Sequence, residues 1–374
     1  MNGLRRIVCL LACSLAFSTP CGAQAAAPVF PGTDWRHIAQ PETAGYSPQK
    51  LAMLRNYLSS LDTTALMVVT GGHVLFEYGD PAHVSVLASA RKSVLAMLYG
   101  KYVHDGTIKL DRTLADIGFD DIKGLSATEK QATVEHLLTA RSGIYHPAAN
   151  SGDDTAHAPE RGSVAPGTKH LYNNWDFNAA GAVFEQLAKR DIYDAFGTDL
   201  AQPLGMQDFD RARQRKTGNR ARSQHLAYHL HLSTRDMARL GLLMLREGRW
   251  QDTQVMPAGW SARITRVITP YDELIPERRR RLGAGERWGY GHMWWTWDTP
   301  AADPSDVMAG AYTARGLGGQ YITVIPRLDM VIAHKVDPRP DGDRTQPRRR
   351  ITATQYGVII RMITGARCPS ASCK

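Results

Sequence analysis

The hydrophobic pattern of the chain is strand-like near both ends and helix-like in the middle. Residues 65–70 and 73–78 form two apolar runs joined by Gly71-Gly72, which is the turn chemistry of a two-residue β-hairpin. Four runs in the last third also predict strands: 289–297, 309–316, 320–326 and 330–335. This arrangement predicts an α/β (α+β) fold in which both ends of the chain complete one antiparallel sheet flanked by helices.

Helical spacing dominates between these strands. Ser47-Pro48 predicts the start of a helix that runs to about Leu61. Residues 107–230 alternate helical segments with polar loops, among them the long loop 148–168, so we expect an inserted helical lobe. Ser233 opens a further helix that ends at Gly248 and whose apolar positions we expect to pack in the core: Met237, Leu240, Gly241 and Met244.

The stretch 88–106 reads as one helix that begins near Ser89 and ends at Gly106. We expect one apolar stripe on it to be buried, formed by Val94, Leu95, Leu98 and Tyr102. Pockets form preferentially between lobes, so the start of this helix is a candidate site.

Ser89 and Lys92 are three residues apart at the predicted start of this helix, so their side chains share one face. A helix N-terminus carries free N–H groups and a positive dipole end, which favour an unprotonated lysine and stabilise an oxyanion. Such an arrangement activates a weak serine hydroxyl as a nucleophile. The pattern indicates a serine hydrolase, although this spacing also occurs by chance in many helices.

Tyr172 and Asn174 lie close together in a polar stretch. The Tyr172 phenol could share a proton with Ser89 and Lys92, because a neighbouring ammonium lowers the pKa of a phenol. Asn174 could hydrogen-bond a substrate amide or Lys92. A surface tyrosine in a loop is the alternative interpretation.

Glycines separate two predicted strands in the stretch 314–320. Glycine allows the backbone to approach a ligand closely, so an N–H here could face a substrate oxygen; a plain tight hairpin is the alternative. The spacing matches neither a dinucleotide-binding nor a P-loop fingerprint, and no cofactor is expected.

These three stretches, in this order, resemble the serine β-lactamase and penicillin-binding superfamily. The similarity covers roughly residues 46–365 and is strongest to class C β-lactamases and their relatives, the 6-aminohexanoate-dimer hydrolases and the family esterases. The resemblance implies that Ser89 is the acylated nucleophile, Lys92 its partner and Tyr172 the general base. It also implies that Asn174 contacts the substrate, and that the oxyanion hole is the backbone N–H of Ser89 and that of Leu317, next to Gly316.

One position departs from the pattern of that superfamily. The Lys-Thr-Gly motif of lactamases and penicillin-binding proteins aligns with Ala314-Arg315-Gly316, so a methyl group replaces the lysine that helps to bind a carboxylate. Strand alternation places Arg315 on the face opposite Ala314, while Trp294, Trp295 or Trp297 could line the pocket. We therefore expect short esters or linear amides to be better substrates than a cephalosporin.

The first 25 residues read as a leader rather than as part of the fold. Arg5 and Arg6 precede an apolar run at 7–17 that is too short to span a bilayer, and Ala23-Gln24-Ala25 is a small-x-small cleavage signal. A lipoprotein site at Cys13 is less favoured, because the apolar run before it is short. We expect cleavage near Ala25 and export to the periplasm or beyond, with no stable membrane span.

The exported chain would begin with an irregular arm at 26–46, followed by the hydrolase domain at 47–366 and a tail at 367–374. With 374 residues, 43% of them hydrophobic and 22% charged, the chain can bury a large core. After the leader is removed, only Cys368 and Cys373 remain, and they are expected to form one disulfide.

Arginine runs at 278–281 and 348–350 account for part of the net charge of +9. No aromatic residues or nucleic-acid motifs lie beside them, so they read as solvated loops and no nucleic-acid partner is expected.

The expected function is an exported serine hydrolase that cleaves ester or amide bonds of small substrates through an acyl-enzyme on Ser89. A β-lactamase or D-Ala-D-Ala peptidase and a non-catalytic binding protein that kept the fold stay open as alternatives. A zinc hydrolase built on His225, His229 and His231 is disfavoured, because no His-Glu-x-x-His helix accompanies them, and no metal is expected.

Overall fold

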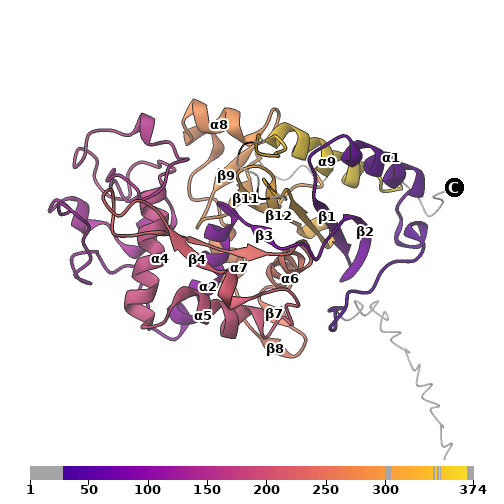
Figure 1. The fold of residues 1–374 in the computed structure, drawn as a ribbon, viewed down its shortest axis with the longest axis horizontal. Coiled ribbons are helices and arrows are strands. Elements are labelled where there is room, and N and C mark those ends of the chain that lie inside the picture. The colour runs from indigo at the N-terminus through magenta and orange to yellow at the C-terminus, as the bar shows by residue number, and fades with distance from the viewer. Residues whose placement is uncertain (1–27, 300–304, 340–341, 343–344, 346, 369–374) are drawn as a thin grey trace, which may run out of the picture.

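The computed structural model describes residues 28–299, 305–339, 342, 345 and 347–368. The predicted leader at 1–25 lies outside these residues, as does most of the predicted tail. A seven-stranded antiparallel sheet with the order β2-β1-β13-β12-β11-β10-β9 runs through the structure (Figure 1). Its strands are β1 (Ala65–Thr70), β2 (His73–Gly79), β9 (Trp288–Tyr290), β10 (Trp295–Trp297), β11 (Tyr312–Gly316), β12 (Gln320–Ile325) and β13 (Met330–Lys335).

The predicted sheet, completed by both ends of the chain, is confirmed. β13 pairs with β1, so the last strand of the sheet lies beside the first one, and β1 and β2 form the predicted hairpin. Gly71 and Gly72 both have positive φ, at 58° and 80°, as the tightest hairpin turns require. Three two-stranded pairs stand apart from this sheet: β3 (Ser85–Val86) with β6 (His231–Leu232), β4 (Arg215–Thr217) with β5 (Ala227–His229), and β7 (Arg249–Trp250) with β8 (Thr253–Gln254).

Helices cover both faces of the sheet. Figure 1 shows α1 (Pro48–Ser59) and α9 (Ala353–Gly365) side by side on one face, and α6 (Thr234–Leu245) on the other. α6 reaches the sheet closely because it presents Gly241: a Cβ there would lie 2.4 Å from Cγ1 of Val331. The predicted burial of the apolar positions of α6 is confirmed, and Ser233 caps this helix.

The helical lobe occupies the middle of the chain, as predicted. It contains α3 (Val134–Leu138), α4 (Asn174–Ala188) and α5 (Ile192–Phe196), and the short helices α7 (Trp260–Thr265) and α8 (Pro276–Leu282) follow later. Single 3-10 turns lie at Pro41–Ala44, Glu129–Gln131, Thr155–His157, Arg211–Arg213, Tyr271–Glu273 and Pro326–Leu328, and a π turn at Gly197–Ala201. The loop 148–168 contains only one of these turns, so it is irregular as expected.

The helix α2 (Ala90–His104) is buried far beyond the single predicted stripe. Every residue from Ala90 to Gly100 is buried, including Arg91 and Lys92. The reason is that α2 packs against β11 on one side and against α4 and α7 on others. The polar side chains of a helix enclosed in this way need hydrogen-bond partners inside the protein. This requirement applies to Arg91 and Lys92.

One further expectation needs correction. The single strand predicted at 289–297 is two strands, β9 and β10, joined by a turn in which Met293 has a φ of 61°. The apolar pattern hides this turn because it is buried: the carbonyl of Met293 accepts a hydrogen bond from Ser93 Oγ (2.6 Å).

The helix α9 was not predicted, although Thr352 and Gln355 form a capping box at its start. Among the described residues, no helix has both the length and the apolar character needed to cross a membrane.

Candidate active site

A sharp turn presents Ser89 at the start of α2. Ser89 is the N-cap residue, and Ala88 before it has a positive φ of 47°, which is uncommon and costly for a residue with a Cβ. The carbonyl of Leu87 approaches β11 so closely that a Cβ on Gly316 would lie 2.3 Å from it. The strained turn and this glycine together bring the edge of β11 next to Ser89.

Lys92 lies at the centre of the polar groups behind Ser89. Its Nζ is 3.2 Å from Ser89 Oγ, 2.7 Å from the Tyr172 hydroxyl and 2.8 Å from Asn174 Oδ1. The structure thus brings together all four side chains that the sequence singled out. The stretch with Tyr172 and Asn174 reaches Lys92 because α4 begins at Asn174, with Asn173 as its N-cap.

Burial dominates the electrostatics of this cluster. Burial lowers the pKa of Lys92 well below its ordinary value, and the positive charges of Arg91 and Arg278 lower it further. Burial also raises the pKa of Tyr172, against a lowering effect of Arg278. The sequence-based expectation of a phenol with a lowered pKa is therefore wrong, because desolvation outweighs the nearby charge. The arrangement favours a neutral lysine beside a neutral phenol.

Asn174 is engaged at both ends of its amide. Its Oδ1 accepts a hydrogen bond from Lys92, and its Nδ2 donates to the Ser151 carbonyl (2.9 Å). Its backbone N–H donates to Asp153 Oδ2 (3.0 Å), so the loop 148–168 also holds the start of α4. The geometry supports a role for Asn174 in orienting Lys92, and contact with a substrate stays a prediction.

A cavity of about 460 Å³ opens beside Ser89 and Tyr172. Of the three candidate tryptophans, Trp295 lines it, and Trp294 is fully buried elsewhere. The lining residues are Ser89, Gly152, Tyr172, Arg278, Arg280, Arg281, Leu282, Trp295, Arg315, Gly316, Leu317, Gly318, Tyr321, Arg350, Ile351, Thr352, Ala353 and Thr354.

Gly316 and Leu317 lie at the rim of this cavity. The Leu317 side chain is 78% exposed. Within the part of the chain that the structure describes, the backbone N–H groups of Ser89 and Leu317 donate no hydrogen bond. Both donors are thus available to a substrate oxygen, which is compatible with the predicted oxyanion hole.

Of the two arginine runs, 348–350 is the exposed loop that the sequence suggested, but 278–281 is not. Residues 278–281 belong to α8, where Pro276 occupies the first turn, and Arg278 is only 12% exposed. Arg278 Nε donates to Asp154 Oδ2 (2.8 Å), and its guanidinium lies over the Tyr172 ring. A proline followed by an acidic residue and a basic run is a helix signal that could have identified α8 in the sequence.

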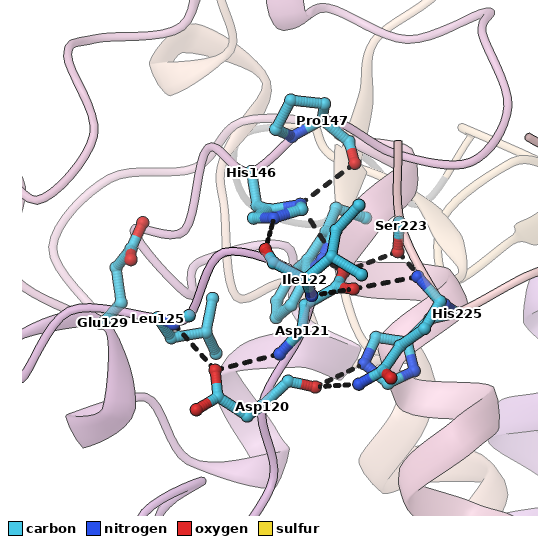
Figure 2. A network of polar contacts seen from close by, with 12 residues as sticks. Asp120, Asp121, Ile122, Leu125, Glu129, His146, Pro147, Ser223 and His225 are labelled. Atoms are coloured by element: carbon cyan, nitrogen blue, oxygen red, sulfur yellow. Dashed lines mark hydrogen bonds and ion pairs between the residues drawn. The ribbon is translucent and has the colours of Figure 1, made fainter. Parts of the chain in front are cut away.

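A second polar network supports the start of α4 from the side of the lobe (Figure 2). Asp121 Oδ2 accepts hydrogen bonds from Ser223 Oγ (2.5 Å) and from Trp175 Nε1 (2.7 Å), and Trp175 follows Asn174 directly. Burial alone would raise the pKa of Asp121, but the hydrogen bonds from Ser223, Gln224 and Trp175 lower it below its ordinary value. A charged Asp121 thus ties the loops of the lobe to the helix that carries Asn174.

The histidines considered as zinc ligands serve other contacts. His225 Nε2 lies 2.8 Å from the Asp120 carbonyl, and His229 Nε2 lies 2.8 Å from Thr217 Oγ1. Burial lowers the pKa of His229 and of His231 to about 4. Within the described ranges, no group of three or more histidine, cysteine, aspartate or glutamate residues could hold a metal ion.

Known proteins resemble this chain in sequence pattern and in fold. A family model described as Beta-lactamase matches residues 53–353. No curated protein matches the sequence.

Several solved structures share the fold. A Bacillus anthracis protein named as a 6-aminohexanoate-dimer hydrolase is 18% identical with a TM-score of 0.63, over 90% of this chain and 89% of that one. A penicillin-binding protein homologue from Caulobacter crescentus is 14% identical with a TM-score of 0.59, over 86% and 99% of the two chains. EstCE1, described as a hydrolase with promiscuous acyltransferase activity, is 13% identical with a TM-score of 0.58, over 87% and 98%. At these identities the likeness concerns the fold alone.

Proposed function

The chain belongs to the beta-lactamase family, and on that premise we propose that it is a serine hydrolase cleaving an ester or amide bond of a small substrate. The observation that carries the proposal is Lys92 Nζ within 3.2 Å of Ser89 Oγ and 2.7 Å of the Tyr172 hydroxyl, beside a cavity that both Ser89 and Tyr172 line. A nucleophile, a base of lowered pKa and a shared proton partner are the groups that acyl transfer needs.

In the first half of the proposed reaction, Ser89 Oγ attacks the substrate carbonyl carbon and its proton passes to the neutral amine of Lys92. The backbone N–H groups of Ser89 and Leu317 stabilise the oxyanion that forms. The carbon–oxygen or carbon–nitrogen bond then breaks. The leaving group takes a proton from the Tyr172 hydroxyl. The protonated Lys92 then returns a proton to the Tyr172 oxygen across their 2.7 Å contact.

In the second half, water attacks the acyl-enzyme carbonyl. One proton of this water passes to the neutral amine of Lys92, directly or through the Tyr172 hydroxyl, which gives up its own proton to Lys92 as it accepts one. The bond between the acyl carbon and Ser89 Oγ then breaks, and Ser89 Oγ takes the proton back from Lys92. Burial of both groups keeps competing water away from this proton exchange, since Lys92 is fully enclosed by α2, α4 and the Phe177 ring 4.1 Å from Nζ.

We also propose export of this hydrolase, with residues 1–25 as the leader and 47–366 as the enzymatic domain. Cys368 is disulfide-bonded, which is typical of proteins in oxidising compartments. N-terminal sequencing of the protein recovered from the periplasm or medium tests this proposal: a mature chain that starts near Ala26 supports it, and an uncleaved Met1 in the cytosol contradicts it.

Hydrolysis of 4-nitrophenyl acetate by the wild type and by Ser89→Ala tests the function directly. Turnover that depends on Ser89 supports a hydrolase. Binding of small esters without turnover favours the alternative of a non-catalytic protein that kept the fold.

A further inference from the structure

Positive charge is concentrated in the cavity beside Ser89. Three segments far apart in the sequence contribute to its lining: α8, the end of β11 and the residues before α9. The basic lining residues are Arg278, Arg280, Arg281, Arg315 and Arg350. No aspartate or glutamate is among the described lining residues.

Only part of this charge is neutralised by neighbouring carboxylates. Asp154, whose side chain is 1% exposed, binds both Arg278 (2.8 Å) and Arg281 (3.2 Å), and Glu277 pairs with Arg280. Arg315 and Arg350 form no ion pair with any described carboxylate. One aspartate shared by two arginines, together with two arginines lacking a carboxylate, leaves a surplus of positive charge facing the cavity.

Two of the arginines are held in place before any ligand arrives. Arg315 Nη2 donates to the Leu282 carbonyl (2.8 Å), and its guanidinium carbon lies 5.4 Å from the centre of the Tyr321 ring. Arg278 is fixed by Asp154 and by the Tyr172 ring, and its Nη2 is a buried donor without a described partner. A buried donor left unpaired is costly, so this nitrogen favours a ligand that brings an acceptor.

Arg315 lies on the face of β11 that strand alternation predicts, and it still reaches the cavity. Ala314 is buried and Arg315 faces Trp288 and Tyr321, so the expected alternation along β11 holds. The cavity, however, extends around the end of β11 toward α8 and therefore includes Arg315. The expectation that Arg315 cannot take over from the missing lysine therefore does not hold for this end of the cavity, and the predicted disadvantage of anionic substrates such as a cephalosporin loses its physical basis.

We propose that this arginine cluster is an anion subsite, so that the substrate of Ser89 is an ester or amide carrying a carboxylate, phosphate or sulfate group. The inference rests on the proposed function. In this account Asp154 is a positioning residue, and the loop 148–168 serves to hold the two α8 arginines over the cavity. Guanidinium groups suit such a ligand because they donate two parallel hydrogen bonds to an oxyanion.

Two matched pairs of chromogenic esters test the subsite. The first pair is 4-nitrophenyl hexanoate and the 4-nitrophenyl monoester of adipic acid, which place a methyl group or a carboxylate at the end of equally long acyl chains. The second pair is 2-nitrophenyl acetate and 4-acetoxy-3-nitrobenzoate, which differ by a carboxylate on the leaving group. In at least one pair we expect kcat/KM of the anionic ester to exceed that of the neutral one by about tenfold at low salt, with the ratio falling as salt screens the charges.

Single substitutions separate the subsite from the general charge of the protein. Arg315→Gln and Arg350→Gln should each reduce the anionic-to-neutral ratio by about fivefold. Arg348→Gln is the control, because Arg348 is exposed and lies outside the cavity lining while the charge change is the same. An equal loss of the ratio in Arg348→Gln, or no preference in either pair, overturns the subsite while the proposed hydrolase stands.

A binding measurement keeps the subsite testable if neither type of ester is turned over. Titration calorimetry of the Ser89→Ala protein with citrate should then show binding that the double variant Arg315→Gln/Arg350→Gln loses and Arg348→Gln retains. That outcome supports the subsite although the proposed function has failed. Absence of citrate binding at low salt overturns the subsite as well.

Discussion

The guanidinium carbon of Arg278 lies 4.1 Å from the centre of the Tyr172 ring, so a cation from α8 covers the phenol that contacts Lys92. This positive charge acts on both titrating groups of the candidate site. It lowers the pKa of Lys92, in addition to the larger effect of burial, and it opposes the raising of the pKa of Tyr172 by burial.

Removal of this cation should change the pH dependence of activity. Lys92 accepts a proton only in its neutral form, so kcat/KM should rise with pH and level off well below the ordinary pKa of a lysine. In Arg278→Met the pKa of Lys92 rises, and the ascending limb should move to higher pH. The pH profile of kcat/KM for a neutral ester measures this shift.

Arg279→Met is the matched control, because Arg279 belongs to α8 but does not line the cavity. An unmoved limb in Arg278→Met, or an equal shift in the control, argues against Lys92 as the group that titrates.

Replacement of Tyr172 by phenylalanine removes the hydroxyl and keeps the ring. We expect kcat to fall by on the order of 10² to 10⁴, the usual contribution of a positioned acid or base. Tyr290→Phe is a suitable control, because its ring lies 6.0 Å from that of Tyr172 and its hydroxyl has no described partner. A Tyr172→Phe enzyme within about threefold of the wild type would assign the proton transfers to Lys92 alone.

Gly316→Ala tests the close approach of β11 to the Ser89 turn. The added Cβ would lie 2.3 Å from the Leu87 carbonyl oxygen, so the strand or the turn has to shift. We expect a loss of stability of about 1–3 kcal/mol, together with reduced kcat because the oxyanion donors separate. Thermal unfolding and ester hydrolysis measure the two effects. Gly365→Ala, where nothing lies within 4 Å, should match the wild type in both, and equal behaviour of the two variants would refute this role of Gly316.

The disulfide at Cys368 allows a chemical test of its predicted pairing with Cys373. Cys368 is disulfide-bonded, and its partner lies outside the described residues. If the leader is removed, Cys373 is the remaining cysteine, so peptide mapping of exported protein without reductant should recover a 368–373 cross-link and no alkylated thiol. Two alkylated thiols per chain would contradict the pairing.

The sequence predicted those parts of the fold whose patterns are local. The hairpin at Gly71-Gly72 and the helices that begin after Ser47 and Ser233 have turn or cap residues that report directly on backbone conformation. The β9–β10 turn was missed because it is buried and apolar, and the full burial of α2 depends on packing against distant elements.

The same distinction applies to the site. Ser89 and Lys92 could be grouped from their helical spacing, Tyr172 and Asn174 were candidates from their side-chain chemistry, and the family resemblance supplied a role for each. The arginine cluster could not be found in this way, because α8, β11 and the segment before α9 meet only in the folded chain. The cavity has a surplus of positive charge because arginines from all three segments line it, and neither arginine run reveals this by itself.

Covalent labelling determines whether Ser89 is the nucleophile. The purified protein is treated with a fluorophosphonate, and the adduct is located by intact mass and peptide mapping, in parallel with Ser89→Ala. We predict one adduct per chain at Ser89, with neither adduct nor ester hydrolysis in Ser89→Ala. An adduct on another residue, or a Ser89→Ala protein that hydrolyses esters at the wild-type rate, would contradict the account.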